Sequence, residues 1–328
     1  MIHIRCGDDM RPAFEASGLP GEYIKCADPL CEGPTPANTE GAAWREVRAG
    51  FACEAYGVTL NKAEQFLTEQ ESGLSRAETA GEVVLWFEHD IFDQIILISL
   101  LERFARQRAR AGRLTLICID GYPGIERFFG LAQLGPEALS NLYAKRVEVT
   151  DKQFDIASRA WSAYRGTDPT AIETILTEDT TALPFLANAF LRHLEDFPSV
   201  RGGLARTERQ ALLAVSDGPQ MAGQVFGANQ AMEEARWCGD TMFWGWLRRL
   251  AGGRMPALAI KGPEMWHLDS DLAAETTISL TRAGKAIMNG AADWVNLSGI
   301  DRWLGGVHLQ GPQAAWRWDE ARRQLAAA

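Results

Sequence analysis

The chain has 328 residues, of which 46% are hydrophobic and 23% are charged, an ordinary composition for a globular protein. A formal net charge of −10 argues against a protein that binds nucleic acid through bulk positive charge. No apolar run approaches the ~20 residues of a membrane span, the first residues lack a signal-peptide pattern, and six cysteines are too few for a disulfide scaffold. We therefore expect a cytoplasmic protein that does not enter a membrane.

Length and charge distribution both predict more than one part. A single core rarely serves more than about 250–300 residues. The net charge is −11 over residues 1–200 and +1 over residues 201–328, so the whole excess of acid lies in the first three-fifths of the chain. Such an asymmetry suggests parts with different roles.

Residues 1–150 have the pattern of a Rossmann-like α/β domain with an open parallel sheet. Short apolar segments typical of strands occur at residues 2–7, 23–27, 83–87 and 114–119, with a fifth at 146–149. Helical spacing separates them at 9–17, within 40–72, and at 92–110. The near-continuous apolar run at 83–87 is typical of a strand buried on both faces of a parallel sheet. Strands alternating with helices indicate an α/β architecture.

The remaining residues predict three further segments. Residues 151–203 have helical spacing and form a connector. Residues 204–295 predict a winged-helix-like domain, because three helices precede a hairpin made by 258–261 and 278–281. Residues 296–328 form a Trp-rich tail in which Gly305 and Gly306 would let the backbone approach the first domain closely.

Polar residues follow four of the predicted strands. They are Gly7 and Asp8, Asp28 with Glu32 nearby, Glu88 with His89 and Asp90, and Asp120. Because ligands of open α/β sheets bind outside the carboxyl ends of the strands, we expect these groups to share one cleft. The alternative is that the acids only cap the helices that follow.

The densest group is Glu88, His89 and Asp90, with Asp93 one helical turn later, and these first three are the candidate catalytic residues. Crowded carboxylates raise one another's pKa, so that one acts as an acid while another stays ionised. Alternatively, their oxygens hold a divalent metal such as Mg²⁺. His89 is a candidate base or metal ligand, or else a hydrogen-bonded histidine at a strand end. No spacing typical of zinc sites occurs.

The candidate cofactor-binding residues are Gly7, Asp8, Asp28, Glu32 and Asp93. The chain has neither a P-loop nor a GxGxxG fingerprint, so a nucleotide would have to sit on the helix that follows Gly7 and Asp8. Asp28 occupies the place of the ribose-binding acid of dinucleotide-binding domains. Cys31, beside Glu32, is the one cysteine to test as a nucleophile.

Four motifs carry a resemblance to a bacterial family. They are Gly7-Asp8, the segment from Asp28 to Pro34, the segment from Leu85 to Gln94, and Asp301-Arg302-Trp303-Leu304-Gly305-Gly306. The chain resembles proteins that carry domain of unknown function 1835 with a C-terminal extension, over nearly its whole length. Where that family often has Ser after Gly-Asp, this chain has Asp9, and where it often has His, this chain has Cys31. The resemblance implies the architecture and the place of the site and carries no reaction.

Three functions remain open at this point. The first is a protein that binds a nucleotide or another phosphate-containing small molecule at the carboxyl ends of the strands, with or without catalysis by acid, base or metal. The second is a ligand-sensing regulator whose residues Thr241–Leu250 would read DNA with Arg248, Arg249 and Arg254. A net charge of +1 over the last 128 residues leaves nucleic-acid binding open without supporting it. The third is a non-catalytic partner-binding protein, and a homo-oligomer is compatible with each.

Overall fold

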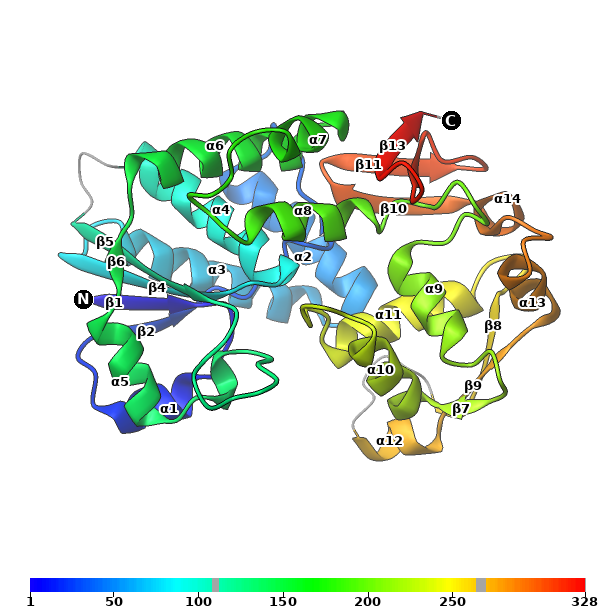
Figure 1. Ribbon diagram of the computed structural model, residues 1–328, viewed down its shortest axis with the longest axis horizontal. Helices are drawn as coiled ribbons and strands as arrows, with labels where there is room; N and C mark the ends of the chain where they lie inside the picture. The colour runs from blue at the N-terminus through cyan, green and yellow to red at the C-terminus, as the bar shows by residue number, and fades with distance from the viewer. Residues whose placement is uncertain (108–111, 264–269, 328) are drawn as a thin grey trace.

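The central sheet contains the five strands that the sequence predicts. The computed structural model describes residues 1–107, 112–263 and 270–327, and it is a mixed α/β structure with a largely parallel sheet and many helices (Figure 1). The sheet has the order β2-β1-β4-β5-β6. Its strands are β1 (Ile2–Arg5), β2 (Glu22–Lys25), β4 (Glu82–Glu88), β5 (Arg113–Ile119) and β6 (Val147–Glu148). The first four run parallel, with Ile4 beside Ile24 and Leu85, and Leu85 beside Leu116.

The fifth strand departs from the predicted parallel arrangement, because β6 runs antiparallel to β5 over two residue pairs. The helix before it, α5 (Pro136–Ala144), already ends at the amino edge of the sheet, where Tyr143 Oη donates to the Met1 sulfur. β6 pairs Val147 with Leu116 and Glu148 with Thr115, so it runs back towards the amino end of β5 before the next helix begins.

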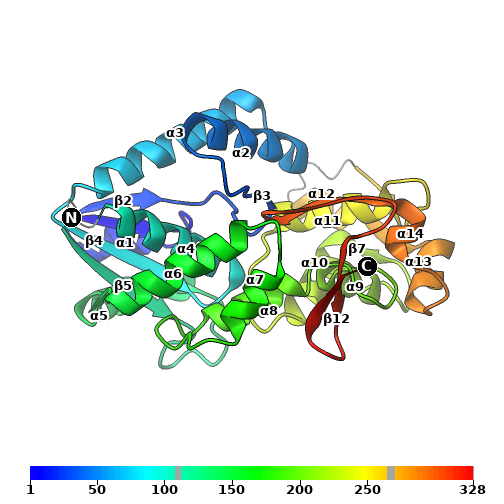
Figure 2. The ribbon, with the colours of Figure 1, turned by 90° about the horizontal axis from the view of Figure 1, so that it is seen from above.

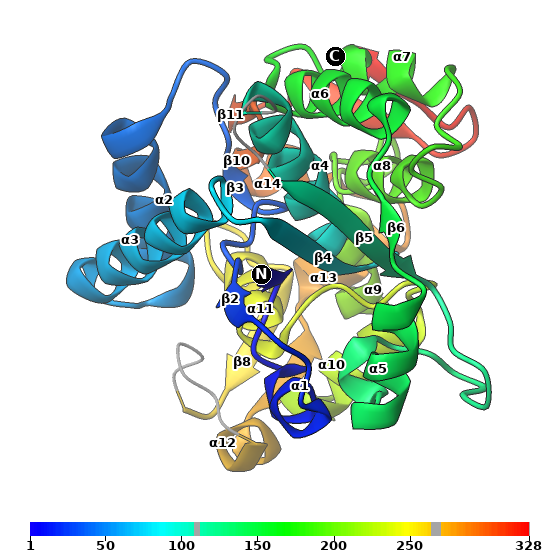
Figure 3. The same ribbon diagram turned by 90° about the vertical axis from the view of Figure 1, so that its left-hand side faces the viewer.

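Both faces of the sheet are covered, as the apolar run in β4 indicates. Val83, Leu85 and Phe87 join the core that includes α4 (Ile91–Arg106) and α6 (Asp151–Arg165). Val84 and Trp86 point to the opposite core, which α5 and α1 (Arg11–Ser17) cover. Figure 3 shows the sheet between these two pairs of helices. The predicted helix 92–110 ends at Arg106 in α4, and Arg108 and Arg110 lie outside the described residues.

A helical pair lies between β2 and β4 in the sequence. The pair consists of α2 (Gly41–Tyr56) and α3 (Leu60–Ala77), which pack against each other, with α3 also against β2 (Figure 2). Between β5 and α5 the chain forms only a short 3-10 turn, η1 (Leu131–Gln133).

The second half of the chain is mainly helical. Its helices are α7 (Thr170–Leu176), α8 (Leu186–Leu194), α9 (Arg206–Leu213), α10 (Ala222–Ala231), α11 (Asp240–Ala251), α12 (Ser270–Glu275), α13 (Arg282–Met288) and α14 (Trp294–Ser298). The expected hairpin is present as β8 (Leu258–Lys261) and β9 (Thr277–Leu280), and β7 (Gln220–Met221) adds a third antiparallel strand that the sequence did not predict. No helix among the described residues has the length and apolarity to cross a membrane.

The Trp-rich tail folds as two hairpins. They are β10 (Ile300–Gly305) with β11 (Val307–Gly311), and β12 (Trp316–Asp319) with β13 (Gln324–Ala327). β10 also pairs in parallel with β3 (Gly33–Pro34), so the tail does reach the first 150 residues as expected. The approach requires glycine, since a Cβ at Gly306 would lie 1.9 Å from the Arg165 carbonyl oxygen.

Candidate functional site

Three predicted acids meet at the carboxyl ends of β1 and β4, where the strand order of the sheet reverses. Glu88, Asp90 and Asp93 each offer a carboxylate oxygen, and these oxygens lie within 4.8 Å of one another. We call them the carboxylate cluster. Arg5, at the end of β1, donates from Nη1 to Asp93 at 2.6 Å and from Nη2 to Glu88. Ligands of open α/β sheets bind in a crevice where the strand order reverses. Here the buried side chains of the carboxylate cluster occupy that position.

Backbone groups fix the cluster further. The Glu88 amide donates to Asp93 at 2.7 Å, and the Asp93 amide donates to Asp90 at 3.1 Å, so that Asp90 is the N-cap of α4. The Leu131 amide donates to Glu88 at 2.7 Å. Gly130 must be glycine, because its φ is +151° and a Cβ there would lie 2.5 Å from a Glu88 oxygen. The alternative prediction, that these acids cap the helices that follow, is therefore confirmed for Asp90.

The environment favours the protonated form of two of these acids. Burial raises the pKa of Glu88 to about 8; the neighbouring Asp93 adds to the rise, and Arg5 opposes it. Burial also raises the pKa of Asp90 well above its usual range, with Asp93 and Glu88 contributing in the same direction. Both pKa values move in the direction expected for crowded carboxylates, and desolvation is the largest cause of each rise.

The cluster does not fit a metal ion as it stands. The Arg5 guanidinium already bridges Glu88 and Asp93, so a divalent cation would have to displace it. Asp93 accepts hydrogen bonds from the Cys6 thiol, the Glu88 amide and Arg5, which leaves it little free coordinating capacity. The carboxylate cluster is therefore better described as an ion-pair network than as a metal site.

A polar cavity of about 470 Å³ opens beside the cluster, outside the ends of β4 and β5. We call it the edge cavity. His89 and Asp90 line it after β4, and Asp120 lines it after β5. The facing wall comes from α8 and from the segments around Arg206 and Glu233. Cavities between a sheet edge and a second structural layer are common ligand sites.

His89 lines the edge cavity and has an unused hydrogen-bonding atom. Its Nδ1 is buried and has no hydrogen-bond partner among the described residues. The ring lies between Phe128 and Phe185, with centroid separations of 6.4 and 6.0 Å. Desolvation lowers the pKa of His89, and Asp120 opposes the change. The imidazole is therefore neutral near pH 7 and able to accept a proton.

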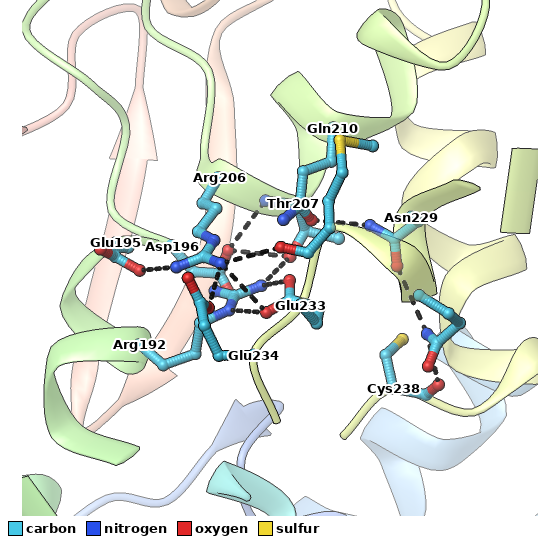
Figure 4. A network of polar contacts seen from close by, with 12 residues as sticks. Arg192, Glu195, Asp196, Arg206, Thr207, Gln210, Asn229, Glu233, Glu234 and Cys238 are labelled. Carbon is cyan, nitrogen blue, oxygen red and sulfur yellow. Dashed lines mark hydrogen bonds and ion pairs between the residues drawn. The ribbon is translucent and has the colours of Figure 1, made fainter. Parts of the chain in front are cut away.

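The facing wall holds two arginines that are paired with acids (Figure 4). Arg192 donates to both oxygens of Glu233, at 2.9 and 2.8 Å, and lies 3.0 Å from Asp196. Arg206 bridges Glu195 at 2.7 Å and Glu234 at 2.5 Å. This wall therefore offers mostly carboxylate oxygens that are already engaged.

The other predicted site residues lie elsewhere, so the expectation of one shared cleft is wrong. Asp8 is exposed and pairs with Lys25 at 2.6 Å and Arg11 at 2.8 Å, and the carbonyl of Gly7 accepts from Tyr23. These groups lie near β2, away from the cavity beside β4 and β5. Asp8 and Asp28 are each paired with a basic side chain near β2 or α2, so their carboxylates do not face the cavity beside β4 and β5.

Asp28 and Glu32 form polar contacts with neighbouring helices. Asp28 pairs with the buried Arg48 of α2 at 2.7 Å, so its carboxylate is not free for a ribose. Glu32 accepts from Tyr56 Oη at 2.9 Å and from Trp246 Nε1 at 2.6 Å. Cys31 is buried, and burial raises the pKa of its thiol well above the usual range, so it is a poor nucleophile.

Sequence reasoning missed Arg5, Arg192 and Arg206. Arg5 alternates with apolar residues in a strand, which predicts an exposed side chain rather than a buried ion pair. Arg192 and Asp196 stand four residues apart on a helical segment, a spacing that could have indicated their ion pair.

The helix expected to read DNA is engaged inside the molecule. Most of α11 is buried, including Phe243, Trp244 and Trp246, and the helix packs against α2. Arg248 donates to the Ala55 carbonyl, and Arg249 lies 4.4 Å from the Trp246 ring. This arrangement disfavours α11 as a groove-reading helix.

No family model matches the chain, and no curated protein matches it. Among solved structures, it is similar to the Orc1 protein of Aeropyrum pernix in complex with DNA, at 16% identity over 74% of this chain and 73% of that chain, with a TM-score of 0.22. A likeness at that TM-score carries no argument about this chain. The resemblance to domain of unknown function 1835 stays a prediction.

Proposed function

We propose that the chain binds a small polar molecule in the edge cavity and that His89 exchanges a proton with it. The observation that carries this proposal is the buried, unpartnered Nδ1 of His89 on the cavity wall. A buried polar atom without a partner is costly, and a ligand donor would satisfy it. Asp120 supports the role, because its charge favours the protonated imidazole.

The charges around the cavity indicate the class of molecule. Arg192 and Arg206 are paired with four carboxylates, those of Glu195, Asp196, Glu233 and Glu234. A phosphate would have to compete with these acids for the same guanidinium groups. We therefore favour a hydroxyl- or amine-bearing molecule over the phosphate-containing ligand that the sequence suggested.

A fragment screen tests the proposal. The wild type and His89→Gln are compared by ligand-observed NMR against polyols, amino alcohols, nucleosides and inorganic phosphate. We expect hydroxyl- or amine-bearing hits that compete with one another and are lost in His89→Gln. The control is His308→Gln, since His308 lies in β11 outside the edge cavity.

Titration of the histidine signals gives a second readout. The His89 signal, assigned by its absence in His89→Gln, should titrate below the usual 6.5 and move further downward when a hit donates a hydrogen bond to Nδ1, because protonation of that nitrogen would break the bond. The absence of any hit, or hits that bind equally to His89→Gln, would refute the proposal.

A further inference from the structure

A second polar cavity, of about 490 Å³, lies where the α/β part meets the C-terminal strands. Its walls come from the segment after β2, from α2 and α11, and from β10 and β11, which lie near one another in Figure 1. We call it the Arg249 cavity. Its central lining residues are Glu32, Phe51, Trp246, Arg249, Arg302 and Trp303.

Arg249 is partly exposed and lacks the acid partner that the buried arginines have. Arg5, Arg48 and Arg192 each form an ion pair with a buried acid. By contrast, no hydrogen bond or ion pair joins Arg249 to another residue in the part of the chain that the structure describes, and its Nε is buried without an acceptor. The guanidinium rests on the Trp246 ring at 4.4 Å. A desolvated guanidinium without an anion is costly, so the cavity is short of one acceptor group.

The nearby charged groups do not supply that acceptor. Glu32 influences Arg249 electrostatically but already accepts hydrogen bonds from Tyr56 and Trp246. Arg302 lies on the same Trp246 ring at 4.7 Å and is held by Glu208 and by the Asp196 carbonyl. Arg302 therefore adds positive charge beside Arg249; it is paired with Glu208, while its Nε is buried without a partner among the described residues.

The charge balance limits the anion that would fit. Four acids face the cavity, namely Glu32, Glu54, Asp196 and Asp301, against Arg248, Arg249, Arg302 and His308. A dianion such as phosphate would meet strong repulsion from these acids. A single carboxylate matches the planar donors of one guanidinium with two parallel hydrogen bonds.

Aromatic rings define the rest of the space. Trp303 stacks on His308 with centroids 4.3 Å apart and planes 7° from parallel, which makes a flat surface, and Phe51 lines the cavity as well. We propose that the Arg249 cavity binds a small monocarboxylate with a flat apolar body, whose carboxylate pairs with Arg249 and whose body packs on these rings. This site is separate from the edge cavity.

The probes are benzoate, indole-3-acetate and inorganic phosphate, titrated into the full chain by calorimetry. The variants are Arg249→Gln and Arg249→Lys, with Arg254→Gln as the matched control, because Arg254 is an exposed arginine just beyond the same helix. We expect saturable binding of at least one carboxylate. Its affinity should fall at least about tenfold in Arg249→Gln, recover in part in Arg249→Lys and stay unchanged in Arg254→Gln.

Folding of the variants is checked by their Tm. Because removal of an unpaired, desolvated charge relieves a cost, Arg249→Gln without ligand should melt at the wild-type temperature or roughly 2 °C above it. Three results would overturn the proposal: no saturable carboxylate binding to the wild type, equal affinity in Arg249→Gln, or tighter binding of phosphate than of both carboxylates. A large drop in the Tm of Arg249→Gln would do the same, since it would mean that Arg249 is already satisfied within the fold.

Discussion

In the edge cavity the two arginines Arg192 and Arg206 are paired with acids, whereas in the Arg249 cavity the central arginine has no acid of its own. The two cavities have similar volumes, about 470 and 490 Å³. Their difference therefore lies in unsatisfied groups rather than in size. The edge cavity lacks a donor for the Nδ1 of His89, and the Arg249 cavity lacks an acceptor for a guanidinium. A ligand of the edge cavity would have to donate a hydrogen bond, and a ligand of the Arg249 cavity would have to accept one.

The largest loss of stability should follow from removing an arginine of the edge cavity, where the arginines are paired with acids. Arg192→Ala leaves Glu233 and Asp196 buried without their cation, and it should lower the free energy of unfolding by about 3–5 kcal/mol. Urea denaturation measures the loss. Arg254→Ala, an exposed change, should stay within about 0.5 kcal/mol of the wild type. Equal effects of the two variants would show that the Arg192 pairs contribute no stability.

A smaller loss of stability is expected from a change at Gly130, in the segment that contacts Glu88 of the carboxylate cluster. Gly130→Ala would place a methyl group 2.5 Å from Glu88 and should cost about 2–3 kcal/mol in unfolding free energy. Gly124→Ala is the control, because Gly124 also has a positive φ but has nothing within 4 Å of its added Cβ. Its cost should be about 1 kcal/mol. If Gly130→Ala cost no more than Gly124→Ala, the contact of the loop with Glu88 would be unimportant.

The carboxylate cluster should also make stability depend on pH. The folded-state pKa of Glu88, about 8, lies above its usual 4.5, so the stabilisation is complete below about pH 4.5 and is lost as the pH rises towards 8. The slope is at most about 1.4 kcal/mol per pH unit from this group. Glu88→Gln, which resembles the protonated acid, should flatten the dependence over this range. Glu64→Gln on the exposed face of α3 should leave it unchanged, and a slope of opposite sign in the wild type would contradict the argument.

The smallest effect belongs to Asp8, a predicted site residue that lines neither of the two cavities. Asp8→Asn removes two exposed ion pairs and should change the free energy of unfolding by less than about 1 kcal/mol. It should also leave fragment binding in the edge cavity as it is in the wild type. A loss of that binding would restore the idea of one shared cleft.

The sequence predicted what depends on local pattern. The strands around Ile4, Leu85 and Leu116 and the hairpin of β8 with β9 all follow from apolar spacing. The clustering of Glu88, Asp90 and Asp93 follows from a strand end and one helical turn. What failed depends on tertiary pairing: the partner of Asp28 is Arg48, and that of Glu32 is Trp246, both supplied by helices far along the chain. Polar residues after strands mark an edge of a sheet but do not reveal which of them a helix will neutralise.

The pairing of β3 with β10 has a consequence for the order in which the protein is made. β3 at residues 33–34 is translated long before its partner β10 at residues 300–305. Trp303 and Arg302 belong to β10, so the Arg249 cavity cannot close until that strand has been made. The strands of the central sheet, by contrast, are all translated by residue 148, and early folding of such an N-terminal unit is the general rule. The Arg249 cavity therefore forms later in synthesis than the sheet.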